Sequence, residues 1–246
     1  MIQEAIIFAV IACAGVLVVS FVGFGLALVM VPLLSLFLLP REFLPSYHML
    51  ALICQLILAI ESRKHIRWRP LARLGGAAMV GIPLGTIALK HLPTDIVSLT
   101  IAVLTLVFAT IFLVNARIRA RKNAFVESLV GLASGFLSGC TAQSGPPIII
   151  YGLARQWDKD MFRATLLAYF SGLSMMTLIW YFSMGLVTVK ATTTAGVALL
   201  PALAVAYLGV RLKNRVNEMV FRRVVLLVIM AVGCMGLASY FLNTSG

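Results

Sequence analysis

The chain has 246 residues, of which 61% are hydrophobic and only 11% are charged, and its mean hydropathy is +1.04. A soluble domain of this size carries about 25% charged residues, so this composition excludes a water-soluble enzyme, a disordered chain and a disulfide scaffold. The net charge of +12 comes from 20 Lys and Arg against 8 Asp and Glu. The basic residues lie in short loops between apolar runs, where they set membrane orientation. The sequence therefore predicts an all-α polytopic membrane protein that contacts the lipid bilayer and no nucleic acid.

Eight stretches carry no charge, and a spanning helix needs about 20 apolar residues. Six of these stretches predict one crossing each, and the first and fifth do not fit a single uninterrupted crossing. In chain order the stretches are 5–40, 43–60, 74–89, 96–116, 128–154, 164–189, 191–210 and 224–246.

Both exceptional runs contain residues that interrupt a helix. The run 5–40 would be about 54 Å long as one helix, and it carries Gly23-Phe24-Gly25 near its middle. The run 128–154 is interrupted by Ser144-Gly145-Pro146-Pro147, where neither proline can donate a backbone hydrogen bond. Broken backbone at membrane depth persists only where protein buries it or a wet cavity borders it. Each run therefore predicts a broken helix or a re-entrant hairpin.

The loop charges favour hairpins. If every run crossed once, the 20 basic residues would divide equally between the two sides, against the positive-inside rule. If 5–40 and 128–154 return to the side they entered, 17 of the 20 share one side, and only Arg41, Lys90 and Lys190 face the other. This predicts one membrane domain of two inverted repeats, 1–122 and 123–246, each a hairpin followed by three spans. Both termini then lie outside the bacterial inner membrane.

The titratable residues offer no catalytic or coupling device. All eight acidic residues border or lie outside the apolar runs, so no carboxylate is placed to relay protons or bind Na⁺. His48 is the histidine that falls within an apolar run, and we expect it at the membrane interface. The four cysteines show no metal-ligand spacing, and no hydrolase or nucleotide motif is present. We expect a protein that is not an enzyme and that has no cofactor or metal.

The two breaks are the places where chemistry is expected. Ser144 is a good N-cap and proline is tolerated in a first helical turn, so this break predicts the start of a half-helix within the bilayer. Its free amides and positive dipole end would attract an anion. Gly23 and Gly25 predict a matching start before Leu26. The alternative is that both breaks are packing kinks.

The candidate substrate-binding residues cluster at these breaks. Near the second break, the side chains of Cys140, Thr141 and Gln143 complete a ligand shell or, alternatively, form hydrogen bonds with backbone groups that the break leaves unpaired. Arg163 guides anions towards the hairpin or, alternatively, anchors the topology. The candidates are Gly23, Phe24, Gly25, Cys140, Thr141, Gln143, Ser144, Gly145, Pro146 and Arg163. Glycines at 131, 135 and 139, and at 81 and 85, predict close helix packing.

At these residues the sequence resembles the TauE/SafE sulfite-exporter family over nearly the whole chain. The resemblance rests on Gly-Phe-Gly followed by Val31-Pro32-Leu33-Leu34, on Ile66-Arg67-Trp68, on Gly139 with Ser144-Gly145-Pro146-Pro147, and on Phe162-Arg163-Ala164. It implies transport of sulfur-containing anions such as sulfite, sulfonates and related organosulfur compounds.

These observations predict a plasma-membrane transporter that exports a small sulfur oxyanion or sulfonate, with a homodimer compatible with the sequence. The absence of a coupling carboxylate fits export, because an inside-negative potential drives anions outward. A non-transporting membrane scaffold or assembly factor and an anion channel remain as alternatives.

Overall fold

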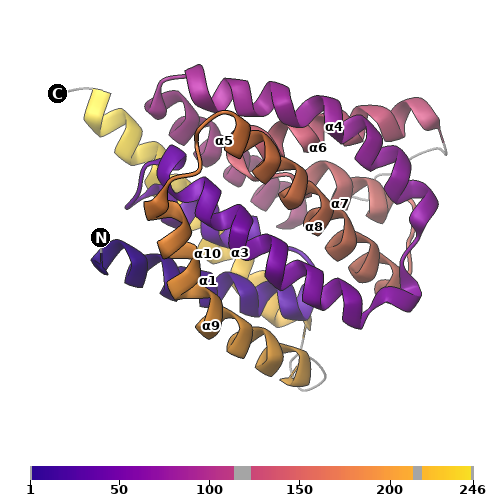
Figure 1. Cartoon of the computed structure of the whole chain (residues 1–246). Helices are drawn as coiled ribbons and strands as arrows, with labels where there is room; N and C mark the ends of the chain where they lie inside the picture. The colour runs from indigo at the N-terminus through magenta and orange to yellow at the C-terminus, as the bar shows by residue number, and fades with distance from the viewer. Residues whose placement is uncertain (1, 114–122, 213–217, 245–246) are drawn as a thin grey trace.

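The computed structural model describes residues 2–113, 123–212 and 218–244 of the chain. These residues form ten α-helices and one 3₁₀ turn, and no strand occurs among them (Figure 1). The elements are α1 (Ile2–Val22), α2 (Leu26–Ser35), α3 (Pro40–Glu61), η1 (Arg63–His65), α4 (Trp68–His91), α5 (Thr94–Leu113), α6 (Ala124–Thr141), α7 (Gly145–Ala154), α8 (Lys159–Ser183), α9 (Val189–Leu212) and α10 (Glu218–Thr244).

Seven helices in the described ranges are long and apolar enough to cross a membrane, namely α1, α3, α4, α5, α6, α8 and α9. Helices α2 and α7 have ten residues each, too few for a crossing. Among the described side chains of α10, Val225–Ala238 form a further apolar segment. These findings confirm an all-α polytopic membrane protein. The basic loop 117–122 and residues 213–217 lie outside the described residues.

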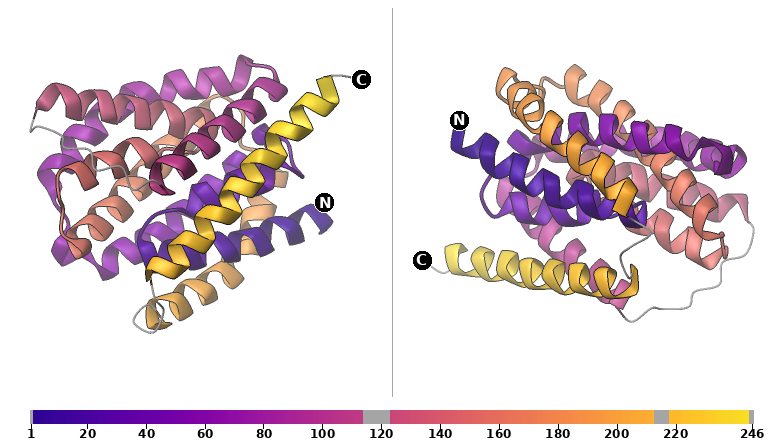
Figure 2. Two further views of the ribbon diagram at one scale, coloured as in Figure 1. Left: turned by 180° about the vertical axis from the view of Figure 1, so that it is seen from behind. Right: turned by 90° about the horizontal axis from the view of Figure 1, so that it is seen from below.

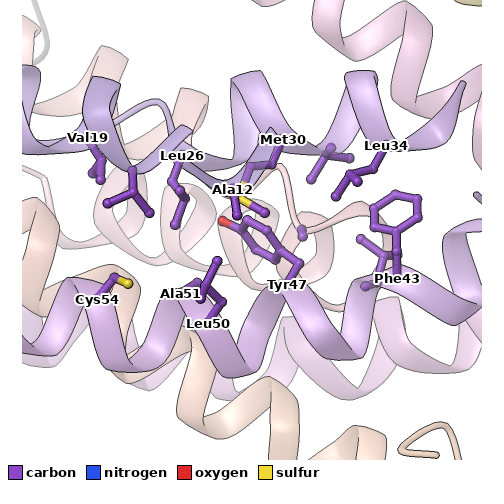
Figure 3. Packing of buried hydrophobic residues seen from close by; sticks show 14 of the residues in the cluster. Ala12, Val19, Leu26, Met30, Leu34, Phe43, Tyr47, Leu50, Ala51 and Cys54 are labelled. Carbon is purple, nitrogen blue, oxygen red and sulfur yellow. The ribbon is translucent and has the colours of Figure 1, made fainter. Parts of the chain in front are cut away.

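The first long apolar run forms an antiparallel helix hairpin. A Cβ atom added to Gly15 of α1 would meet Leu26 and Met30 of α2, whereas one added to Gly25 would meet Val18. Residues later in α2 therefore contact residues earlier in α1, so the two helices run antiparallel. Figure 3 shows the hairpin packed on α3, with Tyr47 of α3 pointing towards it.

The second long run forms a hairpin of the same kind. The Ser134 hydroxyl of α6 donates to the Ser144 carbonyl (2.7 Å), and the Tyr151 hydroxyl of α7 donates to Glu127 near the start of α6 (2.7 Å). Residues later in α7 thus lie beside residues earlier in α6. The broken-helix prediction is confirmed for both runs.

Helices α4 and α6 run parallel in very close contact. A Cβ on Gly131 would meet the Leu74 carbonyl, and one on Gly139 would meet the Ile82 carbonyl. A side chain at these glycines would separate the two backbones, so the predicted packing role of the ladder is confirmed.

Helices α1 and α9 also run parallel. Lys190 at the start of α9 pairs with Glu4 at the start of α1 (3.1 Å), and Gly209 near the end of α9 lies against Ser20 near the end of α1.

Two further pairs run antiparallel. His48 and Arg67 lie in and beyond α3, and they contact Ser174 and Thr165 of α8 respectively. In α5 and α10, Leu106 lies against Gly233, and Ala102 lies against Gly236. The two chain ends lie at the same end of the bundle in all views (Figure 2).

Around the two breaks, the helix boundaries in the two halves of the chain correspond at one offset. Helix α1 ends at Val22 and α6 ends at Thr141, 119 residues later. Helix α2 (26–35) and α7 (145–154) are displaced by the same 119 residues, as are the starts of α3 (40) and α8 (159).

Candidate functional site

Both helix breaks border one buried cavity of about 20 Å³. This volume suits one water molecule. Its walls come from the breaks and from α3 and α8, and no Lys, Arg, Asp or Glu is among the described residues that form them. They are Gly25, Leu26, Ala27, Leu28, Tyr47, His48, Gln55, Ala142, Gln143, Ser144, Gly145, Pro146, Ile149, Phe170 and Ser174.

The first break brings to the wall of this cavity backbone donors that have no backbone acceptor within the described structure. Gly23 (φ 84°) and Gly25 (φ 103°) adopt left-handed conformations that side chains disfavour, and they turn the chain into α2. The Gly23 amide donates to the Val19 carbonyl of α1 (2.8 Å), and the next amide with a backbone partner in the described structure is Val29, which donates to the Gly25 carbonyl (3.0 Å). The preceding amides, at 26–28, are the ones that helix geometry leaves without an intrahelical acceptor. Because these three residues line the cavity, the N-terminal end of α2 is directed to it.

The second break is built differently from the prediction. Ala142 takes the left-handed conformation (φ 58°) that ends α6, and Ser144 is already helical (φ −68°, ψ −15°). Ser144 is the N-cap residue of α7, which begins at Gly145 as predicted, but its side chain makes no capping hydrogen bond within the described structure. An N-cap residue normally has extended backbone, and the helical backbone angles of Ser144 depart from that geometry. Pro146 and Pro147 remove two donors, which leaves α7 fewer free amides than α2.

His48 is not interfacial as the sequence suggested, because it is 2% exposed and lines the cavity. Its Nε2 lies 3.2 Å from the Ser138 carbonyl, which accepts hydrogen bonds but donates none. Nε2 therefore carries the proton, and Nδ1 accepts from the Ser174 hydroxyl at 3.4 Å. The rings of Tyr47 and Tyr181 pack edge-on against the imidazole.

Of the ten predicted binding residues, the structure brings five together at the cavity: Gly25, Gln143, Ser144, Gly145 and Pro146. Three others have local structural roles. Phe24 packs its ring on Phe112 and Phe162. The Thr141 hydroxyl donates to the Leu137 carbonyl and accepts from the Gln143 amide (3.4 Å), so it satisfies freed backbone groups. Cys140 is buried at 3% exposure in α6 and is absent from the cavity wall.

The last two, Gly23 and Arg163, lie together at the far end of the first break. A Cβ on Gly23 would lie 2.5 Å from Cγ of Arg163. The Arg163 guanidinium is buried, donates to the Ser20 carbonyl at the end of α1 (3.2 Å) and pairs with Glu61 at the end of α3 (3.6 Å). Arg163 thus ties α8 to α1 and α3 and does not line the cavity.

At the opposite end of the bundle, Lys190 performs a similar task. Its ammonium contacts Glu42 of α3 (2.8 Å) and Glu4 of α1 (3.1 Å). A buried arginine thus links α1 and α3 to α8 at one end of the bundle. At the other end, a lysine links α1 and α3 to α9.

Sequence reasoning missed the wall that α3 and α8 contribute, with Tyr47, His48, Gln55, Phe170 and Ser174. One signal was present: His48 and Gln55 are polar, lie in one apolar run and are seven residues apart. That spacing places them on the same face of a helix.

Comparison with known proteins identifies a family. The model of the family described as "Sulfite exporter TauE/SafE" matches residues 7–235. No curated protein and no solved structure matches the chain.

Proposed function

Since the chain belongs to the TauE/SafE sulfite exporter family, we propose that it transports small anions across the membrane and exports sulfite, a sulfonate or a related organosulfur anion. The observation that carries the proposal is the cavity that both helix breaks border. A carrier needs its substrate site where broken helices meet, because their free backbone groups replace the water that the ion leaves behind.

The chemistry of the cavity suits an anion. The amides at 26–28 and the Gly145 amide supply donors without a compensating carboxylate. Two helix starts add partial positive charge of about half an elementary charge each. Binding by dipoles is weaker than binding by a buried cation, so the anion can also leave, as turnover requires.

The arrangement of the helices supports two inverted repeats, 1–122 and 123–246. The offset of 119 residues pairs the two hairpins and the starts of α3 and α8, and chain order then pairs α4 with α9 and α5 with α10. Members of the pairs α3–α8 and α5–α10 run antiparallel, as inversion requires. The parallel pairs α1–α9 and α4–α6 exchange under the same operation.

We place the protein in a bacterial plasma membrane with both termini outside. The shared end of the termini in Figure 2 and the charge split of the loops support this orientation. Reporter domains fused before Met1 and after Gly246 are both expected to be active outside the cytoplasm, with a fusion in the 155–158 turn as the inward control. A cytoplasmic location of either terminus contradicts the orientation.

The small volume of the cavity favours a carrier over an open channel. A sulfur oxyanion with three or more oxygens is larger than one water molecule, so the site has to open towards one side to admit it. The contacts of Arg163 at one end and of Lys190 at the other are the ionic links that such opening would break.

The decisive experiment is flux into proteoliposomes at a clamped potential, with sulfite, alkanesulfonates, sulfate and carboxylates compared. We expect saturable flux of the sulfur anions. Flux that rises linearly with concentration supports the channel alternative. A folded protein that carries none of the panel, and that none of the panel stabilises against heat, supports the scaffold alternative.

A further inference from the structure

The side-chain amide of Gln143 is held in one orientation by α5. Its Nε2 donates to the Thr105 hydroxyl oxygen at 2.7 Å and reaches the Ile101 carbonyl at 3.5 Å. The Thr105 hydroxyl donates its hydrogen to the same Ile101 carbonyl at 2.6 Å. Its oxygen can therefore only accept from Gln143. A flipped amide would set oxygen against oxygen, and the contacts therefore fix the assignment of nitrogen and oxygen.

This orientation leaves Gln143 with an acceptor to offer at the cavity. Gln143 is fully buried and lines the cavity, and its Oε1 has no partner among the described residues. Gln55 of α3 also lines the cavity and is 3% exposed, and its Oε1 likewise has no partner in the described structure. A buried acceptor without a donor is costly, so each of these oxygens needs a hydrogen-bond donor.

The cavity thus has donors at the helix starts and acceptors at the two glutamines. A fully ionised oxyanion supplies acceptors alone, which suits the amides of α2 but leaves both glutamine oxygens unpaired. An anion that also carries an O–H or N–H group can accept hydrogen bonds from the amides of α2 and donate one to a glutamine oxygen. Hydrogen sulfite and hydroxylated sulfonates have this chemistry.

We propose that the preferred substrate is an anion bearing its own hydrogen-bond donor, and that Gln143 selects it by accepting from that donor. The proposal rests on the proposed anion-transport function and specifies its substrate class. Thr105 acts as a positioning residue, because it holds the amide of Gln143 without lining the cavity.

The test compares ethanesulfonate with 2-hydroxyethanesulfonate, which carry the same permanent charge and differ by one hydroxyl. Purified protein is titrated with each, and apparent Kd values are obtained from thermal stabilisation. We expect the wild type to bind the hydroxylated anion about tenfold or more tightly, since a site built to bond a hydroxyl rejects the analogue that lacks it.

Variants separate selection from folding. Gln143→Leu should bring the ratio of the two Kd values close to one. Thr105→Val should lower the ratio by freeing the amide to rotate. Thr110→Val is the matched control: it lies on the same helix, its hydroxyl bonds the carbonyl four residues earlier at 2.8 Å, and it is exposed. This control should keep the wild-type ratio.

The outcomes are distinguishable. Equal wild-type affinity for the two sulfonates overturns the selection by Gln143 and leaves the anion site standing. A wild-type ratio that Gln143→Leu preserves in a folded variant overturns it as well. If neither sulfonate nor sulfite stabilises the wild type, the proposed anion site fails, and the selection fails with it.

Discussion

At Gly145, a larger side chain would compete with the ligand for the space of the cavity. A Cβ placed there would lie 3.2 Å from Ile149 Cδ1 and 3.7 Å from Phe170 Cζ, and the backbone is outside the left-handed region. A methyl group therefore fits with a small adjustment, whereas a leucine side chain must enter the cavity of about 20 Å³.

We expect Gly145→Leu to abolish anion flux while the protein inserts and purifies as a folded species. Gly145→Ala, the matched control, should retain flux. Ser144→Ala should weaken binding several-fold at most, because its hydroxyl makes no capping bond in the described structure. The measurement is flux in proteoliposomes with size-exclusion profiles of each variant. Wild-type flux in Gly145→Leu would remove α7 from the mechanism.

Gly23 combines two constraints on the first break. Its φ of +84° disfavours any side chain, and a Cβ would press on the Arg163 side chain at 2.5 Å. Gly185 provides a matched comparison, with φ +72° and open space around its Cβ. Backbone strain of this kind costs about 1–3 kcal/mol.

We expect Gly23→Ala to lower the melting temperature in detergent more than Gly185→Ala does, since the Arg163 contact adds to the shared strain. Equal losses in the two variants would mean that Arg163 relaxes freely and that its contacts with Ser20 and Glu61 are not rigid.

At the scale of elements, the α4–α6 pair depends on its glycines. A Cβ on Gly131 would meet the Leu74 carbonyl and Ala77, whereas a Cβ on Gly76 of α4 would have no neighbouring atom within 4 Å. Leucine at 131 would force two backbones apart, and overpacking of this kind costs about 1–3 kcal/mol or more.

We expect Gly131→Leu to reduce the yield of folded protein and Gly76→Leu to leave it near wild type, as measured by fluorescence-detected size exclusion. A normal yield for Gly131→Leu would show that α4 and α6 tolerate separation, which the carbonyl contacts argue against.

The hairpins were predictable because their causes are local and strong. Gly-Phe-Gly and Ser-Gly-Pro-Pro interrupt runs too long for one crossing, and loop charge indicated the direction of return. The details of the second start were not predictable. Whether Ser144 caps a helix depends on its backbone angles, which are set by the left-handed Ala142 before it and the bond from Ser134 to its carbonyl.

The correspondence between halves was likewise hidden from the sequence. In the 119-residue register, residues 22–44 share only Leu34 with Leu153 and Phe43 with Phe162 of the other half. Apolar side chains substitute freely in a membrane protein, so corresponding helix boundaries can persist where the residues differ. A shift by 114 residues, which aligns Pro32 with Pro146, does not align the helix ends.

At the scale of the whole molecule, a cavity without formal charge leaves the substrate's charge uncompensated during the crossing. Moving one charge through 100 mV is worth about 2.3 kcal/mol, an equilibrium gradient of about fiftyfold. An inside-negative potential therefore drives a monovalent anion outward without a coupled ion.

We expect flux of 2-hydroxyethanesulfonate to follow a clamped K⁺-diffusion potential, to reverse when the potential reverses, and to persist without a proton or Na⁺ gradient. Protons are monitored because His48 places a buried imidazole in the cavity wall, with its Nδ1 accepting a hydrogen bond. His48→Gln keeps a donor for the Ser138 carbonyl and cannot take up a proton, so potential-driven flux should respond to voltage in this variant as in the wild type. The contrary result is wild-type flux that does not respond to the potential and follows the pH gradient, together with flux in His48→Gln that depends on voltage. That result would assign a co-transported proton to His48 and would contradict export driven by the potential alone.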